Sequence, residues 1–386
     1  MDFREPEHIT MLRDTLRRFV EAEMPRSLAA EWDKKNYFPR DVFGRLADLG
    51  VMGLTVPEEY GGHGRDILAC MITIEELAKR SCAVAVPYIM AACYAGMNLL
   101  ECGSEEQKRR LLPEVANGRM IFAYGWTEPD VGSDLAATRT TAVRKGDRIV
   151  VNGAKRFCSG AGIADYIYTL VRSDSEGGRY KNLSFVLIPP TAPGVEITPI
   201  DSLGMKGVPT TDVTFTDVEV PADNIVGGEA GWNQGWPMLV GPGMDVEKLE
   251  VAALALGIAD AALADAWEYS QQRVQFGRPI SSLQSIRHSL AEGKAKVHAA
   301  RLMLYQAAWL ADNRMPCRAE TSMVKMLACE MGKEVVLACQ SILGAYGYVK
   351  GFDMERYVRD SLLMPIIGGS TAIQKNNIAN AFSLPR

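Results

Sequence analysis

The sequence has few residues of the kinds that bind metals or form cross-links. It contains only four histidines, and its eight cysteines are scattered with no Cys-x-x-Cys pair. This pattern favours reduced thiols that serve as small core residues, and it argues against a zinc site. We therefore expect no metal centre.

Charge of one sign and long apolar runs are also scarce. Forty-two basic and forty-seven acidic residues give a net charge of −5, with no block of like charge. Neither nucleic acid nor an anionic membrane surface is therefore an expected partner. The N-terminal residues MDFREPEHITML lack the apolar core of a signal peptide, and we recognise no run of about 18 apolar residues that would span a membrane. We expect a cytoplasmic protein.

Three stretches of different periodicity follow one another along the chain. Residues 1–120 show apolar residues at helical spacing, and residues 236–386 return to this period in long alanine-rich segments. Between them, residues 121–235 contain short β-branched or aromatic segments separated by Gly, Pro, Asn and Asp. The segments predicted as strands are 149–153, 166–173, 183–190, 195–200 and 213–221. This order predicts a helical domain, a small, largely antiparallel β domain and an antiparallel helical bundle.

One predicted helix, in the stretch GPGMDVEKLEVAAL (241–254), begins with three acids. Asp245, Glu247 and Glu250 precede an alanine-rich segment that is otherwise short of charge. Pro-Gly breaks the preceding chain, and acids are favourable near the positive end of the helix dipole. From this window alone, an ordinary helix start is the preferred interpretation.

The segment YGWTEPDVGSD (124–134) stands at the entrance to the predicted β domain. Gly132 and Ser133 form a tight polar turn, while the hydroxyls of Thr127 and Ser133 could hold the polar edge of a heteroaromatic ring or an amide. Composition alone predicts a loop. The fixed Thr, Glu, Pro, Gly, Ser and Asp nevertheless resemble a signature of the acyl-CoA dehydrogenase family, in which an aromatic and two residues precede TEPxxGSD.

This resemblance extends over essentially the whole chain and implies the α+β fold of that family. The fold comprises an N-terminal helical domain, a small antiparallel β-barrel-like middle domain and a C-terminal four-helix bundle. It also implies bound FAD. The segment KRFCSG (155–160) is similar to the second flavin segment of the family, where Phe157 would cover the ring and Ser159 would reach its N5 edge. The cofactor residues implied in these two segments are Tyr124, Trp126, Thr127, Gly132, Ser133, Phe157, Cys158 and Ser159.

Two later segments resemble the parts of the family that hold the rest of the dinucleotide. RVQFGRPISSLQ (273–284) places Arg273, Phe276 and Gln284 at positions that contact the adenylate and pyrophosphate of FAD in a neighbouring subunit. A guanidinium can pair bidentately with phosphate, and an aromatic ring can stack on adenine. Without the resemblance to the family, the preferred interpretation of a single RxxFGR motif is a solvated helix end. Further cofactor positions are implied at Gln340, Leu343, Gly344, Ser370 and Ala372, and the implied assembly is a homotetramer built from dimers.

The catalytic loop departs from the common family pattern. Many members have Glu-Gly-Thr or Glu-Gly-Ser there, with the Glu as base, whereas this chain has Gly368, Gly369 and Ser370. Either the protein is a non-catalytic or altered relative, or its base has moved. In a minority resembling isovaleryl-CoA dehydrogenase and crotonobetainyl-CoA reductase, the base lies on a bundle helix in the pattern Asp-x-Glu-Arg. Residues 245–248 read Asp-Val-Glu-Lys, which implies that Glu247 is the base, with Glu250 in reserve.

The resemblance implies that Glu247 removes the Cα proton of an acyl-CoA thioester while a hydride passes from Cβ to flavin N5. The backbone N–H of Gly368 would stabilise the thioester oxygen. Electrons would then pass to an electron-transfer flavoprotein. The implied substrate-binding residues are Ser133, Asp245, Lys248 and Gly369. A place in the first helical turn lowers the pKa of Glu247, but we expect burial against Met244, Val251 and Leu254 to raise it by more.

Other functions stay open on the sequence. An enoyl-CoA reductase of the same fold would run the reaction in reverse, and an inactive subunit or binding relative is suggested by Gly368. An oxygen-using oxidase is less favoured, because the peroxisomal oxidases are much longer. The acyl group could be straight, branched, cyclic or carboxylated. Residues that could narrow its pocket, although ordinary core packing is preferred for each, are Tyr88, Met90, Cys93, Met97 and Trp126.

Overall fold

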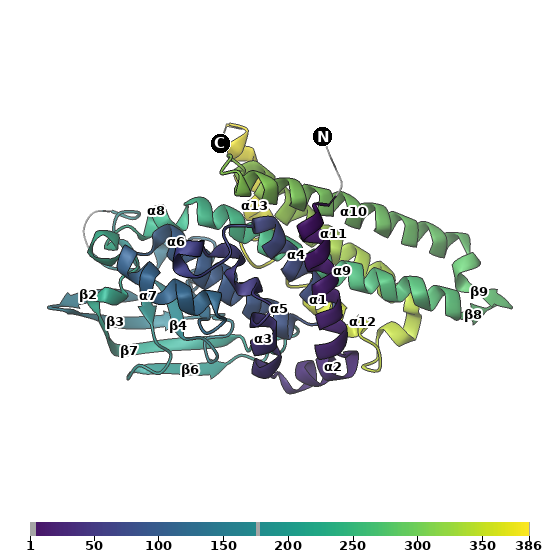
Figure 1. Cartoon of the computed structure of the whole chain (residues 1–386), viewed down its shortest axis with the longest axis horizontal. Helices are drawn as coiled ribbons and strands as arrows, with labels where there is room; N and C mark the ends of the chain where they lie inside the picture. The colour runs from purple at the N-terminus through teal and green to yellow at the C-terminus, as the bar shows by residue number, and fades with distance from the viewer. Residues whose placement is uncertain (1–4, 175–177, 386) are drawn as a thin grey trace.

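The structure, a computed structural model, describes residues 5–174 and 178–385. Helices, then strands, then long helices succeed one another along the chain (Figure 1), which confirms the predicted fold class. The N-terminal helices are α1 (Glu7–Glu23), α2 (Arg26–Lys35), α3 (Arg40–Ala47), α4 (Ile67–Ala78), α5 (Cys82–Tyr88), α6 (Asn98–Cys102) and α7 (Glu105–Ala116).

A π-helix, η3 (Ile89–Met97), joins α5 to α6. Long π-helical stretches are rare, and shorter π-bulges are frequent at functional sites. By length and composition alone, the segment Cys82–Cys102 could cross a membrane, so our expectation that no such run exists was wrong. However, 78% of its apolar window is buried inside the fold, as in the core helix of a folded domain. Tyr88, Met90, Cys93 and Met97 are all buried in this segment, which confirms their preferred interpretation as core.

The middle part is a seven-stranded sheet in the order β1-β4-β2-β3-β7-β6, with β5 also pairing with β4. Most pairs are antiparallel, as predicted, but β1 runs parallel to β4. Our strand predictions missed β1 and β2, which are only four and five residues long. The strands are β1 (Phe122–Gly125), β2 (Thr141–Lys145), β3 (Arg148–Lys155), β4 (Tyr166–Arg172), β5 (Leu183–Ile188), β6 (Val195–Pro199) and β7 (Thr211–Pro221).

The C-terminal part contains α8 (Gly235–Leu239), α9 (Pro242–Gln272), α10 (Gln284–Asp312), α11 (Arg318–Leu343), α12 (Met354–Ser361) and α13 (Thr371–Ala381). A short hairpin of β8 (Val274–Gln275) and β9 (Arg278–Pro279) joins α9 to α10 at the end of the bundle farthest from the sheet (Figure 1). Helix α9 begins at Pro242, as the fixed φ of proline favours at a first helical position. Glu247 therefore lies in the second turn and not, as we expected, in the first.

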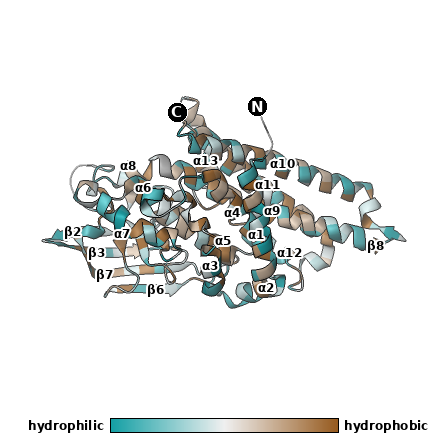
Figure 2. Ribbon diagram, viewed as in Figure 1, coloured by the Kyte–Doolittle hydropathy of each residue, from teal (hydrophilic) through white to brown (hydrophobic). Residues whose placement is uncertain are grey.

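Helix α4 connects the N-terminal part to the bundle. Its side chains are buried from Ala69 to Ala78, whereas α1 presents a largely hydrophilic outer surface (Figure 2). Glu75 on α4 is fully buried, and it accepts a hydrogen bond of 2.6 Å from Arg301 on α10, which also donates to Asp260 on α9. A buried carboxylate requires such partners, so these contacts hold α4, α9 and α10 together in the middle of the bundle.

Candidate active site

Glu247 lies inside the molecule. Only 8% of the residue is exposed, and burial raises the pKa of its carboxyl to about 7, against the opposing attraction of Lys248 and Lys325. The Lys248 ammonium is itself paired with Asp245 at 2.7 Å, so its charge is largely compensated within the same helix. Glu247 thus remains a carboxyl that can exchange a proton near neutral pH. A solvated helix start does not describe it.

Glu250 is a second buried carboxyl, one turn farther along α9. It is 1% exposed, and burial raises its pKa well above the ordinary value, with a further upward contribution from the charge of Glu247. The two lysines that favour ionisation of Glu247 do not appear among the groups that act on Glu250. Glu247 is therefore the member of the pair that ionises first.

The loop that lacks the usual carboxylate lies against the same helix. Gly368 has a φ of +59°, and a Cβ atom built there would lie 2.9 Å from Cγ2 of Val251, one turn beyond Glu247. Both the backbone conformation and this close approach therefore favour glycine. Among the described residues, no group accepts a hydrogen bond from the Gly368 N–H.

Lys325 holds this loop and was not predicted from the sequence. Its Nζ donates to the carbonyl oxygens of Met364 at 3.1 Å and Gly369 at 2.9 Å. Gln374 adds hydrogen bonds from its Nε2 to the carbonyls of Gly368 and Gly369. Lys325 shares the buried face of α11 with Ser322, Val324, Ala328 and Cys329. A single lysine on an otherwise uncharged helical face is the sequence pattern that could have indicated its buried position.

Three stacked aromatic rings lie beside the carboxyls of Glu247 and Glu250. Tyr94 of η3 stacks on Tyr124 of β1 with ring centroids 3.7 Å apart, and Tyr124 stacks on Trp126 at 4.0 Å. Asn98 fixes this arrangement by donating to the Tyr124 hydroxyl at 2.5 Å. Besides burial, the charges of Glu247 and Glu250 raise the pKa of both tyrosines, which places the rings close to the carboxyls.

The two predicted flavin segments meet through a buried ion pair. Lys155 and Glu128 are 2.8 Å apart, with 0% and 5% of their side chains exposed. Lys155 also donates to the Trp126 carbonyl at 3.3 Å, and the Arg156 N–H donates to the Thr127 carbonyl at 2.8 Å. The segments 124–134 and 155–160 are therefore parts of one surface.

Several features of this surface fit the polar edge of a bound heteroaromatic ring. The indole Nε1 of Trp126 is buried and has no hydrogen-bond partner among the described residues. Phe157 is 58% exposed and has a positive φ of 60°, an uncommon conformation for a bulky residue. Its neighbour Ser159 exposes a hydroxyl 3.4 Å from that of Thr210, while Cys158 is buried in the core. Gly132 and Ser133 are exposed in the adjoining turn.

A second group of predicted cofactor residues gathers at the far end of the bundle. Arg273, Phe276 and Gln284 are exposed there, Phe276 by 91%. The Arg273 guanidinium lies 5.8 Å from the Tyr346 ring centre, just beyond Gln340, Leu343 and Gly344 at the end of α11. Glu247 and Arg273 are separated by roughly 26 residues of helix, or on the order of 40 Å. The structure therefore does not bring this group to Glu247 within one chain.

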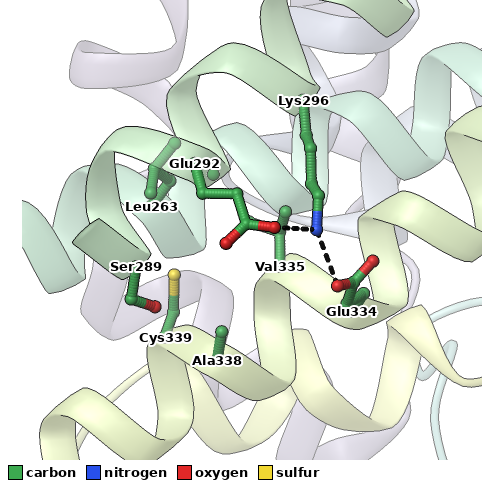
Figure 3. A pocket seen from close by; sticks show the side chains of 9 residues that line it. Leu263, Ser289, Glu292, Lys296, Glu334, Val335, Ala338 and Cys339 are labelled. Atoms are coloured by element: carbon green, nitrogen blue, oxygen red, sulfur yellow. Dashed lines mark hydrogen bonds and ion pairs between the residues drawn. The ribbon is translucent and has the colours of Figure 1, made fainter. Parts of the chain in front are cut away.

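Two hollows among the described residues lie elsewhere. One of about 50 Å³ lies between α9, α10 and α11 (Figure 3), where Lys296 pairs with Glu292 and Glu334 at 2.7 Å each. This space suffices for one or two water molecules. The other, of about 410 Å³, lies on the sheet beside Arg144 and Trp232. Neither is lined by Glu247, so the candidate site rests on the buried carboxyls and their surroundings.

Glu247 is thus a buried carboxyl with a pKa of about 7, beside the stacked aromatic rings and one turn before Val251, which packs on Gly368. Models of the acyl-CoA dehydrogenase N-terminal, middle and C-terminal domains match residues 6–119, 123–218 and 233–382. The chain belongs to the acyl-CoA dehydrogenase family of FAD-dependent oxidoreductases.

Curated relatives and solved structures match nearly the full chain. The probable acyl-CoA dehydrogenase YngJ of Bacillus subtilis is 36% identical over 383 residues, which cover 98% of this chain and 99% of the relative. A subunit of a caffeyl-CoA reductase-Etf complex, CarC of Acetobacterium woodii, is 32% identical over 366 residues and 95% of each chain. A glutaryl-coenzyme A dehydrogenase in complex with glutaryl-CoA has a TM-score of 0.94 at 33% identity, covering 100% of this chain and 98% of that one.

Proposed function

We propose that the protein catalyses the FAD-dependent α,β-dehydrogenation of an acyl-CoA thioester with Glu247 as the base. The observation that carries this proposal is the burial of Glu247, which gives the chain a carboxyl of pKa about 7 although the loop at Gly368 has none. General bases work best with a pKa near the operating pH. An inactive relative would not need a buried carboxyl at Glu247 that can ionise near neutral pH.

The residues of the chain divide the work at the substrate. Glu247 takes the proton from Cα, and the unshared N–H of Gly368 donates to the thioester oxygen as negative charge develops there. Lys325 and Gln374 hold the loop by hydrogen bonds to its carbonyl oxygens. The Gly368 N–H therefore has its orientation before the substrate binds. Bound FAD supplies the acceptor for the Cβ hydride. Tyr94, Tyr124 and Trp126 exclude water from one side.

We assign the flavin ring to the joined segments 124–134 and 155–160, with Trp126, Thr127 and Ser159 as polar contacts. The adenylate and pyrophosphate of FAD would be bound by Arg273, Phe276 and Gln284 of a second copy of the chain, together with Gln340 and Gly344. The exposure of Phe276 and the separation of the two groups along α9 support this division. Sharing FAD between two copies of the chain requires a homo-oligomer, and we propose a tetramer built from two dimers.

The proposed electron acceptor is an electron-transfer flavoprotein, as the name of the Acetobacterium woodii relative suggests. The same name favours a second candidate function, the reduction of an enoyl-CoA by the reverse reaction. The buried base serves both directions, since it returns to Cα the proton that it would otherwise remove.

Anaerobic mixing of the holoprotein with a panel of acyl-CoA thioesters tests the proposed function. We expect at least one saturated acyl-CoA to bleach the flavin absorbance and an added electron-transfer flavoprotein to restore it. Reoxidation of the chemically reduced protein by an enoyl-CoA, without bleaching by the saturated partner, would support the reductase. Failure of every thioester in both directions would identify a binding relative.

The rate of flavin reduction should depend on pH through Glu247. Because only the ionised carboxylate accepts a proton and burial raises its pKa to about 7, the rate should rise as pH increases through about 7. In contrast, an unperturbed glutamate would give a limb near pH 4.3. Stopped-flow flavin reduction at saturating acyl-CoA measures this limb. A rate that is flat across neutral pH would contradict the assignment.

A further inference from the structure

Arg156 and Asp212 form an ion pair where the two segments implied to hold the flavin, 124–134 and 155–160, lie together. Arg156 follows the last residue of β3, and Asp212 lies near the start of β7, which is the neighbouring strand. The Arg156 Nη1 donates to Asp212 Oδ2 at 3.1 Å, and the two side chains are 40% and 35% exposed. The reaction as proposed gives neither side chain a role.

Two contacts hold the Arg156 cation beside the flavin segments. Its backbone N–H donates to the Thr127 carbonyl at 2.8 Å, which ties the residue to the segment 124–134. Its guanidinium carbon lies over the Phe157 ring, 5.2 Å from the ring centre and within the range of a cation–π contact. Phe157 is the exposed aromatic residue of the segment 155–160. The positive end of the ion pair therefore faces this aromatic ring.

Asp212 compensates the charge of Arg156. Its Oδ2 accepts from Arg156, while its Oδ1 is buried and has no hydrogen-bond partner among the described residues. In the part of the chain that the structure describes, Arg156 is also the only cation paired with Asp212. Removal of either side chain would thus leave the other as an unpaired charge of known sign next to the segment 155–160.

We propose that the Arg156–Asp212 pair sets the reduction potential of the bound flavin, with Arg156 raising the potential and Asp212 limiting that rise. This inference rests on the proposed function, in which the flavin ring lies at segments 124–134 and 155–160. A hydride brings two electrons and one proton, so the cofactor becomes more negative by one unit when it accepts the hydride from Cβ. A nearby cation favours this change, and a nearby anion opposes it. The pair therefore biases the direction of the reaction, because a higher potential favours dehydrogenation.

The midpoint potential of the substrate-free holoprotein tests this role without turnover. Anaerobic reduction beside a reference dye, followed by flavin absorbance, measures it. We expect Arg156→Met to lower the potential and Asp212→Asn to raise it. Each change should be about tenfold in the equilibrium constant of two-electron reduction, or about 30 mV. Because the pair is partly exposed, both shifts should shrink at an ionic strength of about 1 M. Arg156→Lys keeps the charge and should stay closer to the wild type.

The opposite signs distinguish a charge effect from a structural one, because damage to the flavin site would move both variants in the same direction. Arg148 and Glu219 give the matched control, since they pair at 4.0 Å across the same two strands with 43% and 55% of their side chains exposed. Arg148 stands at the other end of β3, roughly 26 Å from Arg156 by the rise of a strand. Arg148→Met and Glu219→Gln should leave the potential unchanged. Shifts of one sign in Arg156→Met and Asp212→Asn, or shifts no larger than those of the controls, would overturn the proposal.

The potentials and the acyl-CoA panel can fail separately. Opposite shifts without bleaching by any thioester would support the role of the pair and refute the proposed function. Bleaching without the shifts would do the reverse. If Arg156→Met loses its flavin, Asp212→Asn decides, and an unchanged or lowered potential in that variant contradicts the role. A wild type that binds no flavin would refute the flavin assignment and the role of the pair with it.

Discussion

Replacement of Glu247 by Gln is expected to slow flavin reduction by about 10²–10⁴-fold, the usual contribution of a general base. The amide fills the same space but cannot accept a proton, so binding of the acyl-CoA should change little. The loss should therefore appear in the limiting rate at saturating substrate and not in the substrate concentration at half-saturation. Anaerobic stopped-flow spectroscopy of the flavin measures both quantities.

Glu268→Gln provides a matched control for this experiment. Glu268 lies on the same helix, and the substitution is chemically identical, but its side chain is exposed and contacts Gln272. It should reduce flavin at the wild-type rate. If Glu247→Gln also does so, and Glu250→Gln instead abolishes reduction, the base is Glu250 and the assignment from the Asp-x-Glu pattern is wrong.

The surroundings of Gly368 disfavour a glutamate at that position of the loop. A glutamate there would need a positive φ, and its Cβ would meet Val251 Cγ2 at 2.9 Å. Strain of this kind costs on the order of 1–3 kcal/mol. The close packing of this loop on α9 therefore favours glycine at position 368, in agreement with our proposal that α9 supplies the carboxylate.

Short-range patterns in the sequence predicted the helical, β and helical order of the chain and the helix start at α9. Asp245 occupies the first turn of α9, as expected, and the two segments implied to hold the flavin, 124–134 and 155–160, lie together. The first-turn position given to Glu247 was wrong, although Pro242 supplied the correct signal, since proline favours the first helical position. Counting from Pro242 places Glu247 in the second turn and removes the conflict between dipole and burial.

Contacts between distant segments were not predictable in this way. Lys325 reaches the loop at Gly369 across 44 residues, and Cys93 of the π-helix η3 lies 3.6 Å from Cys70 of α4. Long π-helical stretches are rare, so the apolar pattern of Ile89–Met97 did not predict one. The single-letter sequence also does not reveal that Lys155 and Glu128 pair in the core.

Replacement of Lys155 by Met should have the largest effect on stability, a loss of about 3–5 kcal/mol in the free energy of unfolding. The substitution leaves the Glu128 carboxylate buried without its cation, although it still accepts hydrogen bonds from Arg139 and Thr140. It also removes the hydrogen bond from Lys155 to the Trp126 carbonyl, which joins the two flavin segments. We therefore expect the variant to release flavin at a lower denaturant concentration than the wild type does. Flavin fluorescence measures this release.

The double variant Glu128→Gln/Lys155→Met separates charge from packing. Without the carboxylate no buried charge is unpaired, so the double variant should be more stable than Lys155→Met alone, and the difference measures the coupling between the two residues. Lys296→Met is the surface control, because Lys296 pairs with two carboxylates in Figure 3 but is partly exposed, and exposed pairs contribute little. Equal unfolding of Lys155→Met and Lys296→Met would show that the buried pair does not hold the flavin segments together, and their meeting would then depend on the backbone bond from Arg156 to Thr127.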